Sequence, residues 1–588
     1  MNLSRPFGTL YTMRSYPTLK RWAILMNVPP GQGGSCQSSV GDLYCGRETP
    51  RSNEQGISYF LRPMESYDVA IIGGALSGSA TALLLLRERP ELKVLILEKS
   101  TSFGRRVGEA TVEVSGYFLG RVLGLTQHLN EAHLVKQGMR FWFFNERTGT
   151  LADCSEIGGR YLARVPGYQV DRAVLDEEVL QRALTSGAEL WRPATVTKVQ
   201  LVPGGRQLLQ VQNGGQVKEI SARWVVDASG VAAVLARQHG WWRPNPEHPT
   251  TAVWARWTGV KDWDSHALAA KFPDWANACH GIRATATNHF VGDGWWAWCI
   301  PLKGGDVSIG VVFDQRLVQW PEHGTVGQRL KEFLMQHPAA HEIMNDAQWV
   351  EGDVHWRKNL PYYSTTVAGD GFALVGDAAA FLDPLYSPGM DWISFTATST
   401  SQLIAAAQRG ANVTELSEKH NRDFTRSYRR WFEGIYQDKY EYMGEFDLMR
   451  LAFLLDLGFY YLGVASQPFK RGARALTEPV FSTPKSAPVF YLMRGYNRRF
   501  ASIARTRRAR NRLGKLNDSR RFMFKGYTFA ASSAFPIIQA FTSWALLEVK
   551  EGWRSWFRYK QTETPQTSTH PGASQTPIPK SQLTQPVT

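Results

Sequence analysis

The pattern of apolar and polar residues predicts an α/β region followed by a helical region. An apolar strand ends in "YDVAIIGGALSG", and the helix "SATALLLLRER" follows the glycine-rich turn. Further apolar strands are predicted in "KVLILEKS", "ARWVVDASG" and "GFALVGDAAAFLDP". From residue 401 to 560 the periodicity is helical, as in "QLIAAAQ" and "LMRLAFLLDLGFYYLG". We therefore expect mixed strands and helices over residues 64–400 and helices over 401–560.

The two ends of the chain do not show the pattern of a folded domain. Residues 1–40 contain no Asp or Glu and are rich in Ser, Arg and Gly, which resembles a targeting segment. The alternative, which we favour, is that Met64 is the natural start and that residues 1–63 are a non-core extension. Residues 561–588 are rich in Pro, Thr, Ser and Gln, so we expect this tail to be disordered.

The charge of the chain raises the question of an anionic partner. The formal net charge is +15, and a basic run lies between Arg494 and Lys525. No nucleic-acid-binding module accompanies the run, so we expect no nucleic-acid partner, and a solvated basic helix is the simplest interpretation. Residues 526–547 carry no charge, which fits a packed C-terminal helix or a segment lying on a membrane surface.

The five cysteines form neither a disulfide pattern nor a metal site. They are Cys36, Cys45, Cys154, Cys279 and Cys299, with no C-x-x-C pair and no His cluster at zinc spacing. We therefore expect no metal and a reducing, cytoplasmic compartment, with a peripheral membrane contact left open.

The first strand, turn and helix have the features of a dinucleotide site. Gly73 allows the tight turn, and Gly78 lets the helix pack close to the strand, with the pyrophosphate at the helix N-terminus. Ala75 replaces the second glycine of the usual pattern. Glu98 ends the next strand, where a carboxylate accepts the ribose hydroxyls. With the later strand ends at Asp227 and Asp377, this order points to FAD rather than NAD.

These motifs resemble the glutathione-reductase-type FAD fold of single-component monooxygenases. The resemblance rests on "IIGGALSG", "VGEAT", "DASG" and "GDAAAFLDP" and covers roughly residues 66–400. It implies an FAD-binding domain with an interleaved β-sheet substrate domain and a helical C-terminal extension. The residues expected to form the FAD site are Gly73, Gly74, Ala75, Gly78, Glu98, Gly108, Ala110, Asp227, Gly230, Gly376, Asp377, Pro384 and Gly389.

Two further motifs resemble those of the flavin-dependent halogenases. Residues 296–301, "WAWCIP", match the W-x-W-x-I-P motif, in which two indoles, here Trp296 and Trp298, separate the substrate from the flavin. The alternative is a Trp-rich core strand beside a cofactor. In "HLVKQGMRFWFFN", Lys136 corresponds to the family's catalytic lysine, which receives hypohalous acid; taken alone, it would be a surface lysine.

The halogenase resemblance implies FAD reduced by a separate flavin reductase, with O₂ and halide as co-substrates. Two departures occur in "LDPLYSPGMDW". Tyr386 stands where tryptophan-specific relatives have a catalytic glutamate, and Pro388 lacks an N–H where halide is bound. We therefore expect an electron-rich aromatic substrate, free or carrier-bound, rather than free tryptophan. The alternatives are an FAD monooxygenase or reductase acting on a lipid-like or polyketide-like substrate, and a flavin-binding protein without turnover.

Overall fold

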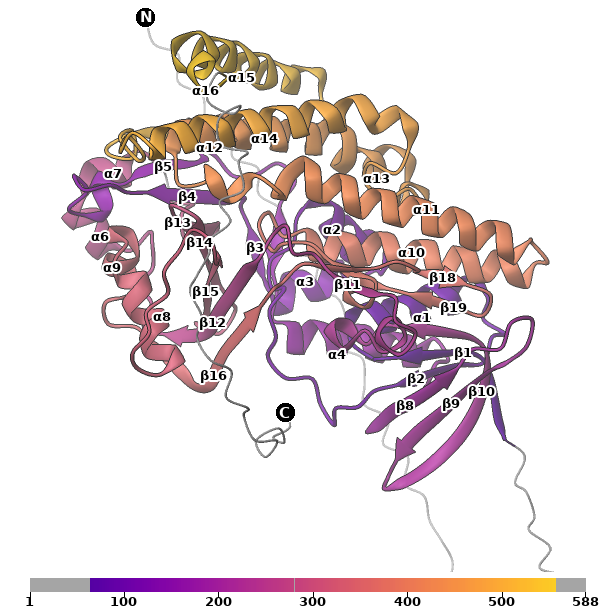
Figure 1. The fold of residues 1–588 in the computed structure, drawn as a ribbon. Coiled ribbons are helices and arrows are strands. Elements are labelled where there is room, and N and C mark those ends of the chain that lie inside the picture. The colour runs from indigo at the N-terminus through magenta and orange to yellow at the C-terminus, as the bar shows by residue number, and fades with distance from the viewer. Residues whose placement is uncertain (1–63, 280, 557–588) are drawn as a thin grey trace, which may run out of the picture. The chain divides into compact units, whose positions relative to one another are not determined.

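The computed structural model describes residues 64–279 and 281–556, which belong to one compact unit built on two large sheets. Figure 1 shows the sheets side by side, with the helices of the C-terminal third stacked along one edge. The fold is a mixed α/β fold, as the apolar pattern predicts. The expectations for residues 1–63 and 561–588, and for Cys36 and Cys45, lie outside the described residues.

The first sheet is mainly parallel and carries the dinucleotide motif. Its main path runs β18-β19-β10-β1-β2-β7, with β8 and β9 joined antiparallel to β10. The strands are β1 (Glu65–Ile72), β2 (Val94–Leu97), β7 (Glu189–Trp191), β8 (Ala194–Gln200), β9 (Gln207–Asn213), β10 (Gln216–Asp227), β18 (Ala368–Gly369) and β19 (Phe372–Leu374). Every residue of β2 is buried, which explains its uninterrupted apolar sequence.

Helix α1 (Leu76–Glu88) begins three residues earlier than the apolar pattern predicts. Gly78 consequently lies inside the first turn, where a Cβ would approach the carbonyl oxygen of Gly73 to 1.9 Å. The residue is therefore required for the close contact between helix and turn, as expected, although it lies in the helix rather than before it.

The second sheet brings together segments that are far apart in the sequence. Its order is β16-β12-β15-β14-β13-β4-β5-β21. The strands are β4 (Met139–Phe143), β5 (Ser155–Gly159), β12 (Thr250–Thr258), β13 (Thr287–Gly292), β14 (Trp295–Pro301), β15 (Val307–Asp314), β16 (Gln348–Lys358) and β21 (Arg521–Phe524). Helices α8 (Val326–Met335) and α9 (Pro338–Met344) pack on this sheet.

The C-terminal region is helical except for β21, which the helical prediction for residues 401–560 missed. Strand β21 extends the second sheet by pairing parallel to β5. The main helices are α10 (Pro388–Gln408), α11 (Val413–Trp431), α12 (Phe446–Phe459), α14 (Ala487–Arg508), α15 (Ala534–Leu547) and α16 (Trp553–Trp556). Within the described part of the chain, one helical stretch, Phe446–Arg471, is long and apolar enough to cross a membrane, and most of it is buried in the fold.

Candidate functional site

The turn after β1 is built to approach a phosphate group closely. Gly73 has φ +100°, and a Cβ there would lie 2.6 Å from the carbonyl oxygen of Ala228. Ala75 caps α1 in an extended conformation without any side-chain hydrogen bond to the helix. The first amides of α1 therefore have no capping side chain, which is the arrangement that binds a pyrophosphate.

The acids at the strand ends stabilise their own turns. The Glu98 carboxylate accepts hydrogen bonds from the backbone N–H groups of Gly74 and Ser100, each at 2.8 Å. Asp227 accepts from the N–H groups of Ser229, at 3.0 Å, and Leu235, at 2.7 Å. The two acids lie at the carboxyl ends of β2 and β10, the parallel strands on either side of β1, where the fold type binds nucleotides.

A cavity of about 200 Å³ opens beyond these strand ends. Its lining includes seven of the predicted site residues: Gly108, Ala110, Trp296, Trp298, Asp377, Pro384 and Gly389. Gly376 has φ +57° and packs on Ser77 of α1, and Gly230 has φ +63° at the end of the β10 turn. We call this space the flavin cavity. Burial raises the pKa of Asp377, and Arg357 and Arg172 oppose the rise.

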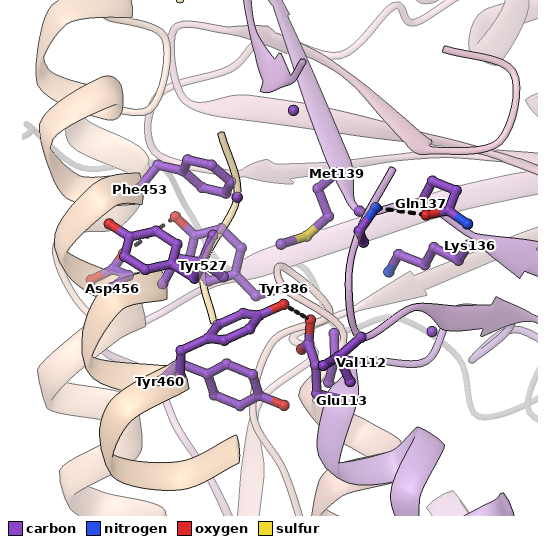
Figure 2. A pocket seen from close by; sticks show the side chains of 18 of the residues that line it. Val112, Glu113, Lys136, Gln137, Met139, Tyr386, Phe453, Asp456, Tyr460 and Tyr527 are labelled. Carbon is purple, nitrogen blue, oxygen red and sulfur yellow. Dashed lines mark hydrogen bonds between the residues drawn. The ribbon is translucent and has the colours of Figure 1, made fainter. Parts of the chain in front are cut away.

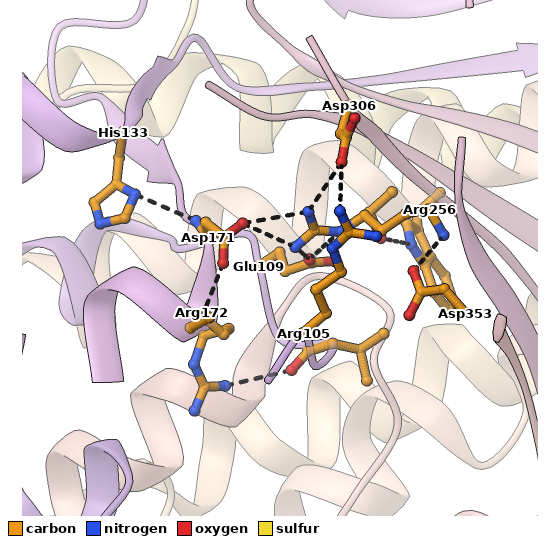
Figure 3. Close-up of polar contacts among 12 residues, drawn as sticks. Arg105, Glu109, His133, Asp171, Arg172, Arg256, Asp306 and Asp353 are labelled. Carbon is orange, nitrogen blue, oxygen red and sulfur yellow. Dashed lines mark hydrogen bonds and ion pairs between the residues drawn. The ribbon is translucent and has the colours of Figure 1, made fainter. Parts of the chain in front are cut away.

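A buried ion-pair network holds the loop of residues 107–111 beside the flavin cavity (Figure 3). Glu109 accepts hydrogen bonds from Arg256 on β12, at 2.9 Å and 2.5 Å. Arg256 also contacts Asp171 at 3.3 Å and Asp306 at 3.9 Å. Glu109 is 2% exposed, so loss of Arg256 would leave a buried charge without its partner. Glu109 therefore anchors the loop to β12 through Arg256.

Strand β14 separates its tryptophans onto two faces. Trp295 belongs to the core between the second sheet and α8, where its ring contacts Phe333. Trp296 and Trp298 point to the other face and line the flavin cavity, with ring centroids 5.9 Å apart. Both are at most 7% exposed. The two indoles form one wall of that cavity, whereas Trp295 is a core residue.

The tryptophan wall is held by partners that the sequence motif does not reveal. The Trp296 indole donates a 2.8 Å hydrogen bond to the Tyr440 hydroxyl, and Tyr440 donates to Asp383 at 2.9 Å. His248 also contacts Asp383, at 2.9 Å. On β15, a Cβ at Gly310 would lie 2.4 Å from the Trp298 ring, so only glycine leaves room for it.

Lys136 lines a second cavity of about 280 Å³, which we call the lysine cavity (Figure 2). Lys136 ends β3 (Leu134–Lys136) and is 2% exposed, so it is not a surface lysine. Its Nζ donates to the carbonyl oxygen of Thr111 at 3.0 Å. The opposite wall comes from the C-terminal helices and the segment after β21, including Phe453, Tyr460 and Tyr527.

The surroundings of Lys136 lower the affinity of its amine for a proton. Burial lowers the Lys136 pKa to about 8, and the nearby carboxylates of Glu113 and Asp391 limit the decrease. Burial also raises the pKa of Glu113, and it raises that of Asp391 to about 7. Glu113 accepts a hydrogen bond from Tyr461. Burial thus shifts the pKa of the amine and of both carboxyl groups toward their neutral forms.

The two cavities meet at the N-terminus of α10. Pro388 lines both of them, and Tyr386 lines the lysine cavity. Tyr386 and Ser387 have φ values of +68° and +57°, an unusual pair of left-handed non-glycine residues. The Tyr386 hydroxyl donates to Asp456 at 3.2 Å. This strained turn brings Pro388 between the tryptophan wall and Lys136.

Sequence reasoning missed the acids around Lys136. Glu113 follows "VGEAT" by two residues, and Asp391 lies within "LDPLYSPGMDW", but neither motif indicated a role for them. Asp391 accepts a 2.9 Å hydrogen bond from the N–H of Ser115 and a 3.1 Å bond from Tyr460. Each acid lies in the first turn of its helix, where an acid is usually a stabilising residue.

Comparisons with known proteins identify families and sequences that are similar to this chain. The family model described as tryptophan halogenase matches residues 158–437, and that of lycopene cyclase protein matches residues 68–243. The flavin-dependent halogenase chlA of Dictyostelium discoideum is 25% identical over 58% of this chain and 60% of its own length. The flavin-dependent halogenase armH3 of Armillaria mellea is 26% identical over 60% of this chain and 69% of its own length. The 1H-pyrrole-2-carbonyl-[peptidyl-carrier protein] chlorinase of Pseudomonas fluorescens is 26% identical over 63% of this chain and 82% of its own length.

Solved structures agree on the fold. Halogenase PltM in complex with phloroglucinol and FAD has a TM-score of 0.65 at 20% identity, covering 81% of this chain and 96% of PltM. The flavin-dependent brominase Bmp2 triple mutant has a TM-score of 0.53 at 21% identity, covering 74% and 100%. By sequence and by fold, the chain is related to the flavin-dependent halogenases, a family of FAD-dependent enzymes.

Proposed function

We propose that the protein is an FAD-dependent halogenase that acts on an electron-rich aromatic substrate. The observation that carries the proposal is the pair of adjoining cavities, with Trp296 and Trp298 in one and a buried Lys136 in the other. Such a division keeps a substrate beside Lys136 from contacting the flavin, so only a small oxidant passes between them. We further propose that residues 64–400 form a glutathione-reductase-type FAD-binding fold with an interleaved substrate domain, and residues 401–560 a helical extension.

The residues around the flavin cavity fit FAD. The uncapped N-terminus of α1 would hold the pyrophosphate, and Glu98 would bind the ribose. The loop of residues 107–111, with Pro384 and Gly389, would hold the isoalloxazine ring. When bound, reduced FAD would supply two electrons to O₂, and the activated oxygen would oxidise halide by two electrons to an electrophilic halogen. We propose that a separate flavin reductase provides the reduced cofactor, as the resemblance to the flavin-dependent halogenases implies.

In the lysine cavity, Lys136 would deliver the electrophilic halogen to the ring. Its amine is held by Thr111 and has a pKa of about 8, so it both donates a hydrogen bond and is partly neutral near that pH. Halogenation of an aromatic carbon releases a ring proton. Glu113, whose pKa burial raises, lines the same cavity and would accept that proton.

The cavity wall favours a phenolic or pyrrolic ring over free tryptophan. Tyr386, Tyr460, Tyr461 and Tyr527 place phenol rings around mainly apolar space. A zwitterionic amino acid would need a paired charge for each end, whereas a neutral aromatic ring, free or tethered to a carrier, does not. The chlorinase relative acts on a carrier-bound pyrrole by its name, which supports a carrier-bound substrate as one form.

One observation favours a second candidate, an FAD monooxygenase or reductase for an apolar substrate. Pro388 at the first position of α10 removes one amide that would otherwise face halide. The N–H groups of Gly389 and Met390, which also line the flavin cavity, remain as donors for the halogenase proposal.

A bromide-dependent turnover assay tests the proposal. The protein, a generic flavin reductase, NADH and a panel of phenols and pyrroles are incubated with and without bromide, and products are read by mass spectrometry. A brominated product that disappears in Lys136→Ala, while FAD still binds, is the expected result. An oxygenated or reduced product that forms equally without halide would establish the second candidate instead.

A further inference from the structure

The outermost helical layer exposes an apolar stripe. Helix α15, the short turn after it and α16 lie outside α12 and α14, at one edge of the molecule (Figure 1). The stripe consists of Phe535, Ile538, Leu546, Val549 and Trp553, which are 69%, 60%, 57%, 76% and 49% exposed. Their spacing of three, eight, three and four residues keeps them on one helical face. Contiguous exposed side chains of this size mark an interaction surface.

The inner face of the same segment is fully used by the fold. Ile537 and Ala540 are buried, and Ile537 packs where Gly458 of α12 leaves space. The Trp544 ring lies 5.9 Å from that of Phe500 on α14. The helix therefore has two apolar faces: an inner face that packs in the core, and the outward stripe, which is exposed.

The charges of the segment are divided between the two faces. Glu548 pairs with Arg499 at 2.8 Å, and Glu551 pairs with Arg507 at 2.5 Å, so both acids are neutralised against α14. Lys550 is exposed next to Val549 in the sequence. Lys550 therefore lies beside the stripe, whereas the two carboxylates of residues 534–556 are paired on the opposite face.

Arginines extend this positive rim beyond the helix end. Arg510, Arg512 and Arg554 line one small surface cleft between α14 and α16, together with Glu551, whose charge is paired with Arg507. Among the residues that the structure describes, none of the three has a carboxylate within ion-pair distance. An apolar stripe with an aromatic residue and a cationic rim complements the surface of an anionic lipid bilayer.

We propose that this face docks the protein on an anionic lipid bilayer, with the stripe inserted among the lipids and the arginine rim on the headgroups. Helix α15 packs along α12 and α14 through Ile537 and Trp544, so it lies along the protein surface and would lie in the plane of the membrane. A second copy of the chain suits the face less well, because a symmetric contact would bring the cationic rims together. The N-terminal extension is also a poor cover, because residues 1–40 carry bases and no acids.

Vesicle co-sedimentation of the full chain tests the proposal without reference to enzymatic activity. Binding is expected to vesicles of phosphatidylcholine mixed with phosphatidylglycerol and to weaken with salt. The double variant Ile538→Ser/Val549→Ser should lower the partition coefficient at least about tenfold. The variant Lys550→Gln/Arg554→Gln should weaken binding to the mixed vesicles and leave the weak binding to phosphatidylcholine alone unchanged.

The matched control is Val217→Ser, which removes a 69% exposed apolar side chain from β10. It should bind vesicles like the unmodified protein. Hydrogen exchange of residues 534–556 should slow when mixed vesicles are added, which checks the surface without any substitution. The proposal is overturned if the unmodified chain does not sediment with mixed vesicles. It is equally overturned if the stripe variants change only self-association in light scattering.

Discussion

Lys136 carries an ammonium group into the interior of the protein, and this has a measurable effect on stability. Its pKa falls from 10.5 to about 8 on folding. Below pH 8 the amine is protonated in both states, so the full destabilisation is present. Between about pH 8 and 10.5 the unfolded chain binds more protons than the folded chain, so stability rises with pH.

Substitution of Lys136 by Met should remove this pH dependence. We expect the free energy of unfolding of Lys136→Met, relative to the unmodified protein, to fall by up to roughly 3 kcal/mol between pH 8 and 10.5. Urea denaturation at several pH values measures the difference. The exposed Lys99, changed to Met, is the control for replacing a lysine by methionine at the surface. A constant difference for Lys136→Met would contradict the assignment of a depressed pKa.

Glu113 offers a second test at the level of one side chain. Glu113→Gln keeps the size of the residue but cannot accept the ring proton, so turnover should fall on the order of 100-fold while the Kd for FAD stays the same. Tyr461→Phe removes the hydrogen bond to Glu113 but keeps the carboxylate, and should lower turnover much less. Steady-state kinetics and flavin titration give both quantities. Full activity in Glu113→Gln would exclude this role.

At the level of elements, the tryptophan wall depends on contact between β14 and the C-terminal region. Tyr440→Phe removes the acceptor of the buried Trp296 indole and the donor to Asp383. We expect a loss of stability of about 1–3 kcal/mol. If the wall also confines the oxidant, the variant should release more peroxide per product formed, measured by a peroxidase-coupled assay.

The control for this element is Tyr428→Phe, which alters another buried tyrosine whose hydroxyl accepts a long, 3.4 Å hydrogen bond from Asn245. It should leave peroxide release unchanged. Equal peroxide release in Tyr440→Phe and the unmodified protein would mean that the hydrogen bond only stabilises the fold.

Strand β14 also shows what a linear pattern can predict. Alternation of side chains along a strand is a local property, so the division of Trp296 and Trp298 from Trp295 follows from the sequence once the strand is recognised. The partners Tyr440, Asp383 and Gly310 could not be predicted, because they come from elements distant in the sequence. Strand β21 was missed for the same reason, since four residues pair only because β5 offers an open edge.

At the scale of the whole molecule, residues 438–556 form part of the site and are not only a peripheral extension. A chain ending at residue 437 loses α12 and the segment after β21, which contribute to one wall of the lysine cavity, and Tyr440, which holds Trp296. We expect it to be insoluble or to lack FAD, whereas a chain ending at residue 560 should retain FAD and its melting temperature. Soluble yield and flavin absorbance measure the outcome, and cooperative melting of the shorter chain would contradict this prediction.

The first sheet was predictable to a greater extent than the lysine cavity. The glycine turn and the position of Glu98 arise from short motifs whose geometry is fixed by backbone requirements at Gly73 and Gly78. The cavity instead depends on where α12 and β21 dock, which is decided by packing over long sequence separations. The burial of Lys136 is therefore a product of tertiary structure, and the sequence alone favoured a surface position for it.

The origin of the cavity wall has a consequence for engineering. The tryptophan halogenase match ends at residue 437, whereas Phe453, Asp456, Tyr460 and Tyr527 of the lysine cavity all lie beyond it. One wall of the lysine cavity is thus encoded apart from Lys136 and from the tryptophan motif. Libraries restricted to residues 453–461 and 524–527 would vary this wall while leaving Lys136, Tyr440 and the two indoles unchanged.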